Sequence, residues 1–365
     1  MKILHVNAGN ETGGGKSHIV SLLSQFNPEE VDLLVFEEGP VAEHARKYNI
    51  NVYVIENKFN LLFTIKSIEK LINKKNYDVI HTHGPRANFF IGLTKKKSHL
   101  IWTTTIHSDP LLDFENRGIK GAIFKKLNIW SYSKIDCFLL ITESFKTQLT
   151  QMNVPENKIV TIYNAIDYSD KNELTPLPKQ LNSNFILLIV ARLQPVKNHA
   201  LLLQALSELE LNNVTLLIAG DGPLEDNLKS ISQDLNLTDS IEFLGHQEDV
   251  DTLYQLADVC LLTSYSEGFP TVLLEAAKFK CPAIATNVGA TKQIIPHSDF
   301  GWVIDNNKDS LKIALTEAYI AWKENRLAHK GELFHKYAKT NFSMPKLAKD
   351  IKAIYCQLLQ TKKKF

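Results

Sequence analysis

Short apolar runs rich in Ile, Val and Leu alternate with amphipathic segments along the chain, and this alternation constrains the fold more than any other feature. Apolar strands separated by helices are typical of parallel sheets that are covered on both faces. Two successive series of this kind predict an α/β protein with two Rossmann-like domains. The predicted strands are 2–7, 31–36, 52–55, 78–82, 100–106, 136–142 and 159–163 in the first series, and 185–191, 214–219, 241–244, 258–263, 283–286 and 301–304 in the second.

A polar segment over residues 168–183 separates the two series, and Pro176 and Pro178 interrupt it. Such a segment is typical of an interdomain linker, and 365 residues exceed what one hydrophobic core usually holds. We therefore expect a first domain over residues 1–168 and a second over residues 184–344. Residues 345–359 have the pattern of a further amphipathic helix.

The charge of the chain is nearly balanced, with a formal net charge of +1, which argues against a dedicated nucleic-acid-binding protein. The distribution is uneven, because residues 58–134 carry a net charge of +9 and residues 1–57 carry −4. A basic stretch indicates contact with an anionic polymer or membrane surface, although such lysines often only solvate helix faces. Relevant lysines are Lys74, Lys75, Lys95, Lys96, Lys97, Lys120, Lys125 and Lys126.

The four cysteines are scattered, without a C-x-x-C pair, which indicates a reducing compartment and no structural zinc. The N-terminal residues read as a short strand and not as a signal peptide. The longest apolar run, 185–191, is too short to span a bilayer. We expect a cytoplasmic protein, with peripheral contact at the inner face of the membrane as the open question.

The segment 266–276 follows a predicted strand and begins a predicted helix, with Pro270 at the first helical position. A helix start offers free backbone N–H groups and the positive end of a dipole, which suit a phosphate. Glu267 and Glu275 lie on either side of this start. A ligand with phosphates in the middle and hydroxyl groups at both ends would suit a helix start with a carboxylate on either side. A nucleotide sugar is such a ligand. The alternative is two surface carboxylates beside an ordinary capped helix.

Further motifs lie where predicted strands end. Segment 191–198 contains Arg192 and Lys197, whose positive charges suit a leaving diphosphate without a metal. Segment 103–109 contains a histidine at the end of the predicted strand, His107, and segment 78–84 contains His81 and His83 on one face of a strand. The other motifs are G-G-G-K-S-H over 13–18, A-G-D-G-P over 219–223, F-L-G-H over 243–246 and Y-N-A-I-D over 163–167.

Together these motifs resemble the retaining GT-B glycosyltransferases of family GT4, and the resemblance spans roughly residues 3–341. The E-x7-E, R-x4-K and T-x-H matches carry it. Departures are Ala191 and Asn198 around the basic loop, and Ala165 in the Y-N-G-I-D motif, where the family usually has glycine. The resemblance implies a GT-B fold, in which two Rossmann-like domains face each other across a cleft, with helix 345–365 packing back onto the first domain.

The resemblance also implies roles for residues. Glu267 and His107 would hold the transferred sugar, Arg192 and Lys197 the diphosphate, and Glu275 the ribose. The predicted donor-binding residues are Gly14, Gly15, Gly220, Gly222, Gly245, His246, Gly268, Phe269, Pro270, Thr271 and Glu275. The predicted acceptor-side residues are Lys16, His18, His83 and Asn164.

The implied activity is metal-independent, retaining transfer of a hexose or N-acetylhexosamine from a nucleotide sugar, with UDP favoured, to a glycan, lipid-linked or polymer acceptor. No cofactor is expected beyond the donor. The alternatives are a nucleotide-sugar epimerase of the same architecture and a non-catalytic nucleotide-sugar sensor.

Two further alternatives follow from short motifs. Residues 15–17 end like the Walker A motif of a P-loop ATPase, but that motif needs glycine where this chain has Asn10. His81 and His83 suit a zinc site, yet the sequence offers no evident third ligand, so we expect no metal.

Overall fold

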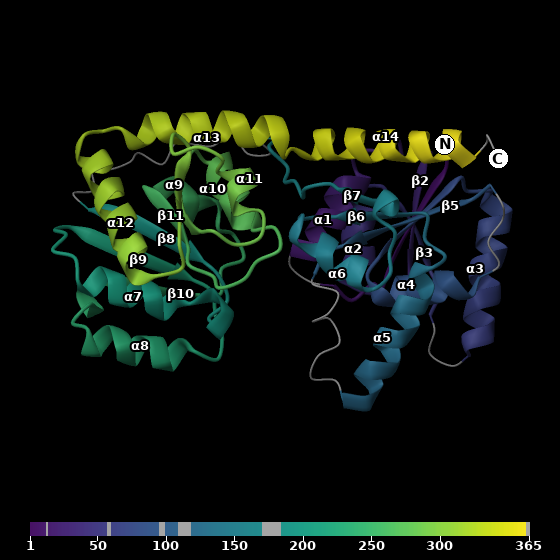
Figure 1. Ribbon diagram of the computed structural model, residues 1–365, viewed down its shortest axis with the longest axis horizontal. Coiled ribbons are helices and arrows are strands. Elements are labelled where there is room, and N and C mark those ends of the chain that lie inside the picture. Colours follow the sequence, from purple (N-terminus) through teal and green to yellow (C-terminus); the bar gives the residue numbers. More distant parts are fainter. Residues whose placement is uncertain (12–13, 57–59, 95–98, 109–117, 170–183, 363–365) are drawn as a thin grey trace. The chain divides into compact units, whose positions relative to one another are not determined.

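The computed structural model describes residues 1–11, 14–56, 60–94, 99–108, 118–169 and 184–362. The chain divides into two compact units, Met1–Asp167 with Met344–Phe365, and Tyr168–Ser343 (Figure 1). Most of the predicted linker, residues 170–183, lies outside the described residues.

Each predicted domain, 1–168 and 184–344, ends one residue later than the corresponding unit, and the second unit begins at Tyr168, before the predicted linker. Tyr168 belongs to the second unit, because its buried side chain donates a hydrogen bond to the Leu274 carbonyl oxygen and its ring contacts His335. Met344 belongs to the first unit, where its backbone N–H donates to the Ile166 carbonyl oxygen.

The first unit is built on a parallel sheet of seven strands within the described residues, in the order β3-β2-β1-β4-β5-β6-β7. The strands are β1 Ile3–Asn7, β2 Val31–Val35, β3 Asn51–Val54, β4 Val79–His83, β5 Ile101–Ile106, β6 Cys137–Leu140 and β7 Ile159–Thr161. The helices are α1 Gly14–Leu23, α2 Pro40–Lys47, α3 Leu61–Lys75, α4 Pro85–Leu93, α5 Gly118–Tyr132, α6 Ser144–Gln151, the short 3-10 helix η1 Glu156–Lys158, and α14 Met344–Lys362.

Helices cover both faces of this sheet. Helix α14 contacts α1 and β5, and α1 contacts α2, whereas α4 contacts both α3 and α5. The apolar core beneath α1, α2 and α14 includes Ile3, Val79 and Ile101, which lie on one face near the amino ends of their strands. Burial of both faces explains why the strands read as continuous apolar runs.

The second unit has a parallel sheet of six strands in the residues described, in the order β10-β9-β8-β11-β12-β13. The strands are β8 Phe185–Val190, β9 Val214–Ala219, β10 Ile241–Gly245, β11 Val259–Leu262, β12 Ala283–Thr286 and β13 Gly301–Ile304. The helices are η2 Pro195–Lys197, α7 His199–Ser207, α8 Glu225–Asp234, η3 Thr238–Ser240, α9 Asp251–Leu256, α10 Thr271–Lys278, α11 Thr291–Ile294, α12 Lys308–Lys323 and α13 Leu327–Asn341.

Here α7 contacts α8 and α12 on one side of the sheet, and α10 contacts α9 and α13. Local signals set several helix ends. The Asn307 side chain accepts a hydrogen bond from the Ser310 N–H at the start of α12, and Asn60 does the same for Leu62 at the start of α3.

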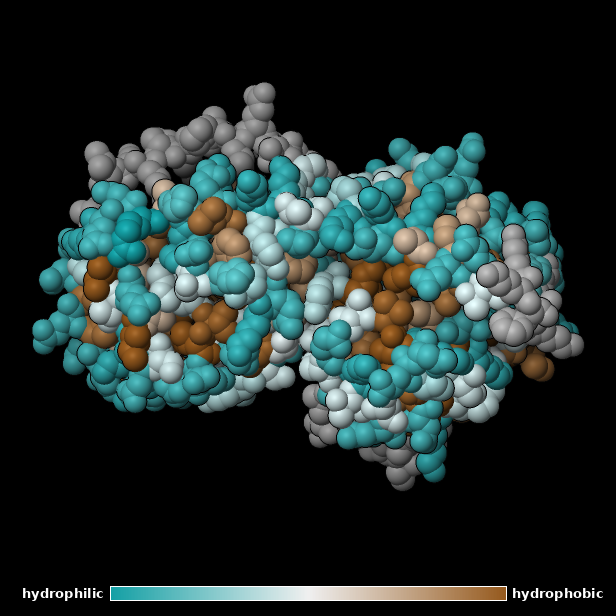
Figure 2. Space-filling view, turned by 45° about the horizontal axis from the view of Figure 1, so that its top comes forward, coloured by the Kyte–Doolittle hydropathy of each residue, from teal (hydrophilic) through white to brown (hydrophobic). Residues whose placement is uncertain are grey.

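On the face that Figure 2 shows, hydrophilic residues cover most of the surface and hydrophobic residues gather in limited patches. Among the described residues, we find no helix whose length and apolar character would let it cross a bilayer.

Candidate functional site

In the second unit, the candidate residues gather where the strand order reverses. Strands β8 and β11 are neighbours at the centre of the sheet, and the chain proceeds from them in opposite directions. The segments that follow β8 and β11 therefore meet at the carboxyl edge of the sheet, where open α/β sheets bind ligands. These segments contain Lys197 and Glu267, two of the residues predicted to be catalytic.

Lys197 and Glu267 form an ion pair across this junction. The Lys197 Nζ atom donates to Glu267 Oε1 at 2.6 Å, and the Ser264 hydroxyl donates to the same oxygen at 2.6 Å. The side chains are only 22% and 14% exposed, so solvent screens the pair weakly. The Thr263 hydroxyl fixes the backbone here by donating to the Lys197 carbonyl oxygen at 2.9 Å. An ammonium and a carboxylate, from residues predicted to hold the diphosphate and the sugar, thus pair at the carboxyl edge of this sheet.

Glu275 lies in the second turn of α10, where the Tyr254 hydroxyl donates to its Oε2 atom at 3.1 Å. Burial raises the pKa of Glu275, and hydrogen bonds from Tyr254 and Thr271 partly oppose this effect. A carboxylate held in a poorly solvated place suits recognition of neighbouring hydroxyl groups, because it accepts hydrogen bonds at both oxygens.

The start of α10 differs by one residue from the prediction. Pro270 is the residue before the helix, with φ −75° and ψ 92°, and Thr271 is the first helical residue. The extended ψ of Pro270 keeps it outside the helix. The side chain of Phe269 is buried and its ring contacts Phe342. Gly268, just before it, is half-buried, and its carbonyl oxygen accepts from the Ala290 N–H.

The turn after β9 packs against the loop after β8. Gly220 has φ +144°, and a Cβ atom there would lie 2.0 Å from the Ala191 carbonyl oxygen. Gly222 has φ +153°, and a Cβ atom would lie 2.5 Å from the Leu193 carbonyl oxygen. The Leu193 N–H donates to the Asp221 carbonyl oxygen at 2.7 Å. These glycines therefore bring two loops of the protein together, which accounts for them without a ligand.

The remaining predicted residues of the second unit are more open. Arg192 is exposed directly after β8, and no salt bridge to it is found among the described residues. Gly245 ends β10, with φ +65° and open space around its Cβ position. His246 follows it and is exposed. Arg192 is therefore accessible in the same loop as Lys197.

In the first unit, the order also reverses at the centre, between β1 and β4. His83 ends β4 and is buried, and His107 follows β5 and is half-buried. Nδ1 of His83 lies 3.1 Å from Nε2 of His107. The His18 ring lies edge-on to His107, with ring centroids 5.3 Å apart. The structure thus brings His18, His83 and His107 together.

Other predicted residues of this unit lie at the start of α1 and after β7. Gly14 and Gly15, predicted to bind the donor, and Lys16, predicted on the acceptor side, lie in the first turn of α1. The glycines accept the helical conformation there, where backbone N–H groups need no intrahelical partner. The side chain of Lys16 lies outside the described part. Asn164 follows β7 and is half-buried.

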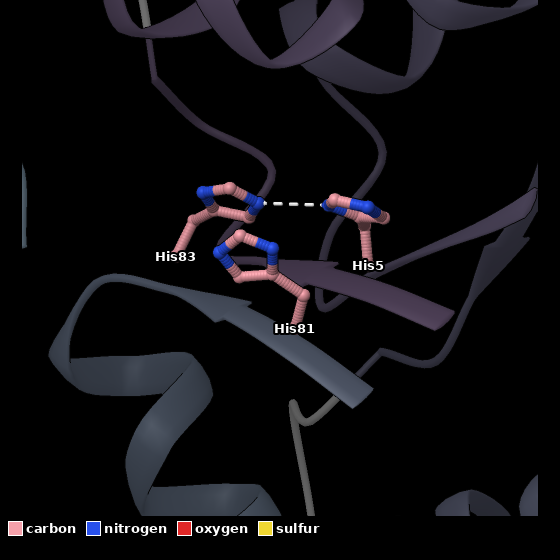
Figure 3. A group of neighbouring side chains, drawn as sticks. All are labelled: His5, His81 and His83. Atoms are coloured by element: carbon pink, nitrogen blue, oxygen red, sulfur yellow. Dashed lines mark hydrogen bonds between the residues drawn. The ribbon is translucent and has the colours of Figure 1, made fainter. Parts of the chain in front are cut away.

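The sequence did not reveal a third histidine, His5, beside His81 and His83. Potential ligand atoms of these three buried residues lie within 4.8 Å of one another. The sequence-based ground for expecting no metal, the lack of a third ligand, is therefore wrong, while the expectation itself stays a prediction. Figure 3 shows the His5 and His83 rings edge to edge, with the His81 ring to one side. Register between strands, which no sequence pattern specified, brings His5 opposite His81.

Comparison with known proteins gives two family matches. Residues 173–339 match the family described as Glycosyl transferases group 1, and residues 12–170 match Glycosyltransferase Family 4. The N-acetyl-alpha-D-glucosaminyl L-malate synthase of Bacillus anthracis is 26% identical over 322 residues, covering 84% of this chain and 81% of that protein. The UDP-Gal:alpha-D-GlcNAc-diphosphoundecaprenol alpha-1,3-galactosyltransferase of Escherichia coli is 25% identical over 312 residues, covering 78% and 79%.

Solved structures support the same fold. HepE from Anabaena, crystallised with UDP, is similar with a TM-score of 0.82 at 19% identity, covering 98% of this chain and 100% of that chain. The same protein has also been crystallised with UDP-glucose, with a TM-score of 0.79 at 17% identity and coverage of 98% and 100%. The predicted GT-B fold is confirmed by these matches together with the two parallel sheets.

Proposed function

Because the chain belongs to the GT4-type glycosyltransferases, we propose that it moves a hexose or N-acetylhexosamine from a UDP-linked donor to a hydroxyl group of a cell-envelope acceptor, retaining the anomeric configuration. The observation that carries the proposal is the Lys197–Glu267 ion pair at the strand-order reversal of the second unit. The names of the Escherichia coli relative and of the HepE complexes support a UDP-linked donor and a lipid-linked acceptor.

The second unit would hold the donor. Arg192 and Lys197 neutralise the diphosphate, which gains negative charge as the glycosidic bond breaks. The first N–H groups of α10 add hydrogen-bond donors at the same edge. Glu275, supported by Tyr254, accepts hydrogen bonds from the ribose, and Glu267 accepts hydrogen bonds from the sugar.

By resemblance we favour front-face substitution without a metal. In this scheme the departing phosphate oxygen takes the proton of the acceptor hydroxyl, and the acceptor oxygen bonds to the same face of the sugar. His107 contacts the transferred sugar. No carboxylate is assigned as a nucleophile, because Glu267 serves the sugar hydroxyls.

The test is a donor screen with the purified protein and a lipid-linked sugar acceptor. The proposal is supported if UDP is released only when the acceptor is present. It is also supported if NMR shows that an α-linked donor gives an α-linked product. An inverted product overturns retention, and loss of activity in excess chelator overturns metal independence. Isomerised sugar from donor alone indicates an epimerase, and donor binding without turnover on any acceptor indicates a sensor.

We also propose peripheral contact of the first unit with anionic membrane. Leu62 and Phe63 at the start of α3 are 67% and 63% exposed, and Phe124 on α5 is 53% exposed. Exposed Lys66 and Lys126 lie on the same two helices. Exposed apolar side chains on helices that also carry exposed lysines suit an anionic lipid surface, and each lysine near it contributes about 1 kcal/mol at low salt.

Co-sedimentation with liposomes of anionic lipid at low salt tests this contact. The wild-type protein should pellet, and a Leu62→Ser, Phe63→Ser variant should pellet less while binding UDP normally. Lack of pelleting by the wild-type protein removes the membrane proposal and leaves the transferase proposal intact.

A further inference from the structure

One face of the sheet in the first unit is apolar where its strands begin, at Ile3, Val79 and Ile101. Toward the carboxyl ends of the same strands, this face bears imidazole side chains. His5 pairs in register with His81, and His83 pairs with Thr105. His107 follows Thr105 by two residues, so alternation of side chains places it on the same face. Three adjacent strands, β1, β4 and β5, thus bring these histidines together.

Three of these imidazoles form one hydrogen-bonded chain. Nδ1 of His5 lies 3.0 Å from Nε2 of His83, and Nδ1 of His83 lies 3.1 Å from Nε2 of His107 (Figure 3 shows the first link). His5 and His83 are 0% and 1% exposed. Each link joins one ring nitrogen to one ring nitrogen, so His83 uses both of its nitrogens within the chain.

Burial keeps these rings neutral. It lowers the pKa of His5 to about 3 and that of His107 to about 4, and it lowers the pKa of His83 well below the ordinary value. A neutral imidazole has one N–H donor and one acceptor nitrogen. The N–H groups must therefore all point along the chain in one direction or all in the other.

The unpartnered Nε2 atom of His5, at one end of the three histidines, determines in which direction the N–H groups point. This atom is buried and finds no hydrogen-bond partner among the described residues. If the donors pointed from His107 toward His5, this atom would be an N–H group without an acceptor, and orphaned buried N–H groups are rarer than orphaned acceptors. The opposite direction leaves only a lone pair there. It makes His5 donate to His83 and His83 donate to His107.

A metal ion fits this arrangement less well. The His81 and His83 rings are stacked, with centroids 4.4 Å apart and planes at 19°, so their in-plane lone pairs do not converge on one point. Nε2 of His81 lies 2.7 Å from the Thr105 hydroxyl, and its Nδ1 contacts the Tyr355 hydroxyl. Zinc needs nitrogens directed at one centre about 2.0–2.1 Å away.

We propose that His5 and His83 are positioning residues that hold His107 in the tautomer with its proton on Nδ1, so that His107 presents an N–H donor to the substrate. His107 acts as a hydrogen-bond donor and not as a base through Nε2, since Nε2 accepts from His83. The link to catalysis rests on the proposed function, whereas the tautomer does not.

The tautomer is measurable without activity. In a protein labelled with ¹⁵N-histidine, long-range proton–nitrogen NMR distinguishes the two tautomers, and a His107→Gln variant identifies the His107 signals. We expect His107 with its proton on Nδ1 in the wild type, and a shift toward the other tautomer in His83→Leu. A wild-type His107 with its proton on Nε2 would overturn the proposal. Added Zn²⁺ that selectively removes the His5 and His83 signals would favour a metal site instead.

Two variants of His5 test the effect on catalysis. His5→Asn retains an N–H donor near the Nδ1 position, whereas His5→Leu removes it. We expect His5→Leu to lower kcat about 3- to 10-fold with a smaller change in donor KM, because the donor to Nε2 of His83 is lost. His5→Asn should remain close to the wild type.

His81→Asn is the matched control, because His81 is equally buried but lies outside the chain. It should change the melting temperature without changing the His107 tautomer. If His107 of the wild type has its proton on Nδ1 but His5→Leu leaves kcat unchanged, the positioning role is overturned. The transferase proposal is not affected by this result. A protein that transfers sugar from no nucleotide sugar to any acceptor substrate would contradict the proposed function. The NMR result would still decide the direction of the hydrogen bonds between the histidines.

Discussion

Replacing Lys197 by Met separates the two roles that the structure gives to this ammonium group. In the structure it pairs with Glu267 at 2.6 Å, with side chains 22% and 14% exposed. An exposed pair contributes about 0.2–1 kcal/mol, and breaking a fully buried pair costs about 3–5 kcal/mol. We therefore expect Lys197→Met to lower the free energy of unfolding by about 1–3 kcal/mol.

The larger effect should fall on diphosphate binding. A hydrogen bond to a charged group contributes about 1.5–3 kcal/mol, which is about 10- to 150-fold in affinity. Titration calorimetry should show this loss for UDP, whereas the same change should have little effect on the binding of uridine, which lacks phosphates. The matched control is Lys280→Met, because Lys280 pairs with Glu332 at the same 2.6 Å but with side chains 52% and 57% exposed.

UDP affinity within about threefold of the wild type in Lys197→Met, together with the expected loss of stability, would refute the assignment. Lys197 would then be a structural ion-pair partner, and the diphosphate would lie elsewhere.

Further predictions concern carboxylates and glycines of the second unit. Glu267→Gln should leave the fold intact, because Ser264 can still donate to the amide oxygen, yet should cut transfer at least about tenfold, as a coupled assay of UDP release would show. The raised pKa of Glu275 means that the folded state binds its proton more tightly, so stability falls as pH rises from the ordinary carboxyl pKa through the raised one. Glu275→Gln should therefore raise the melting temperature at neutral pH, with a gain that vanishes in acid, and should weaken UDP binding; an equal gain at all pH values would contradict this. Gly220→Ala should destabilise by at least about 2 kcal/mol in urea unfolding, and Gly245→Ala by only about 1 kcal/mol, because only the former meets a carbonyl oxygen.

Local patterns were sufficient to predict the strands. Each predicted strand is present, and those over 214–219, 283–286 and 301–304 have the expected ends. The predicted strand 136–142 is shorter, as β6 Cys137–Leu140, and its partner β7 is only three residues long. The length of a strand depends on how many residues of the neighbouring strand pair with it. The apolar run over 136–142 contains no information about the length of its partner β7.

The site was predicted less completely, because its contacts join residues that are distant in the chain. The pattern around Glu267 indicated a ligand-binding helix start, but not the contact with Lys197, 70 residues away. Ser264 and Tyr254 were missed, since a serine near a strand end and a tyrosine in an amphipathic helix are common. His5 was missed because its role depends on strand register.

Hydrogen exchange measured by mass spectrometry, with and without saturating UDP, tests the central claim most directly. The account predicts protection in the segments 191–198, 219–223, 243–246 and 266–276 of the second unit, which lie at or after the carboxyl ends of β8, β9, β10 and β11. Protection confined to other segments, at a UDP concentration where calorimetry shows the site to be full, would contradict it.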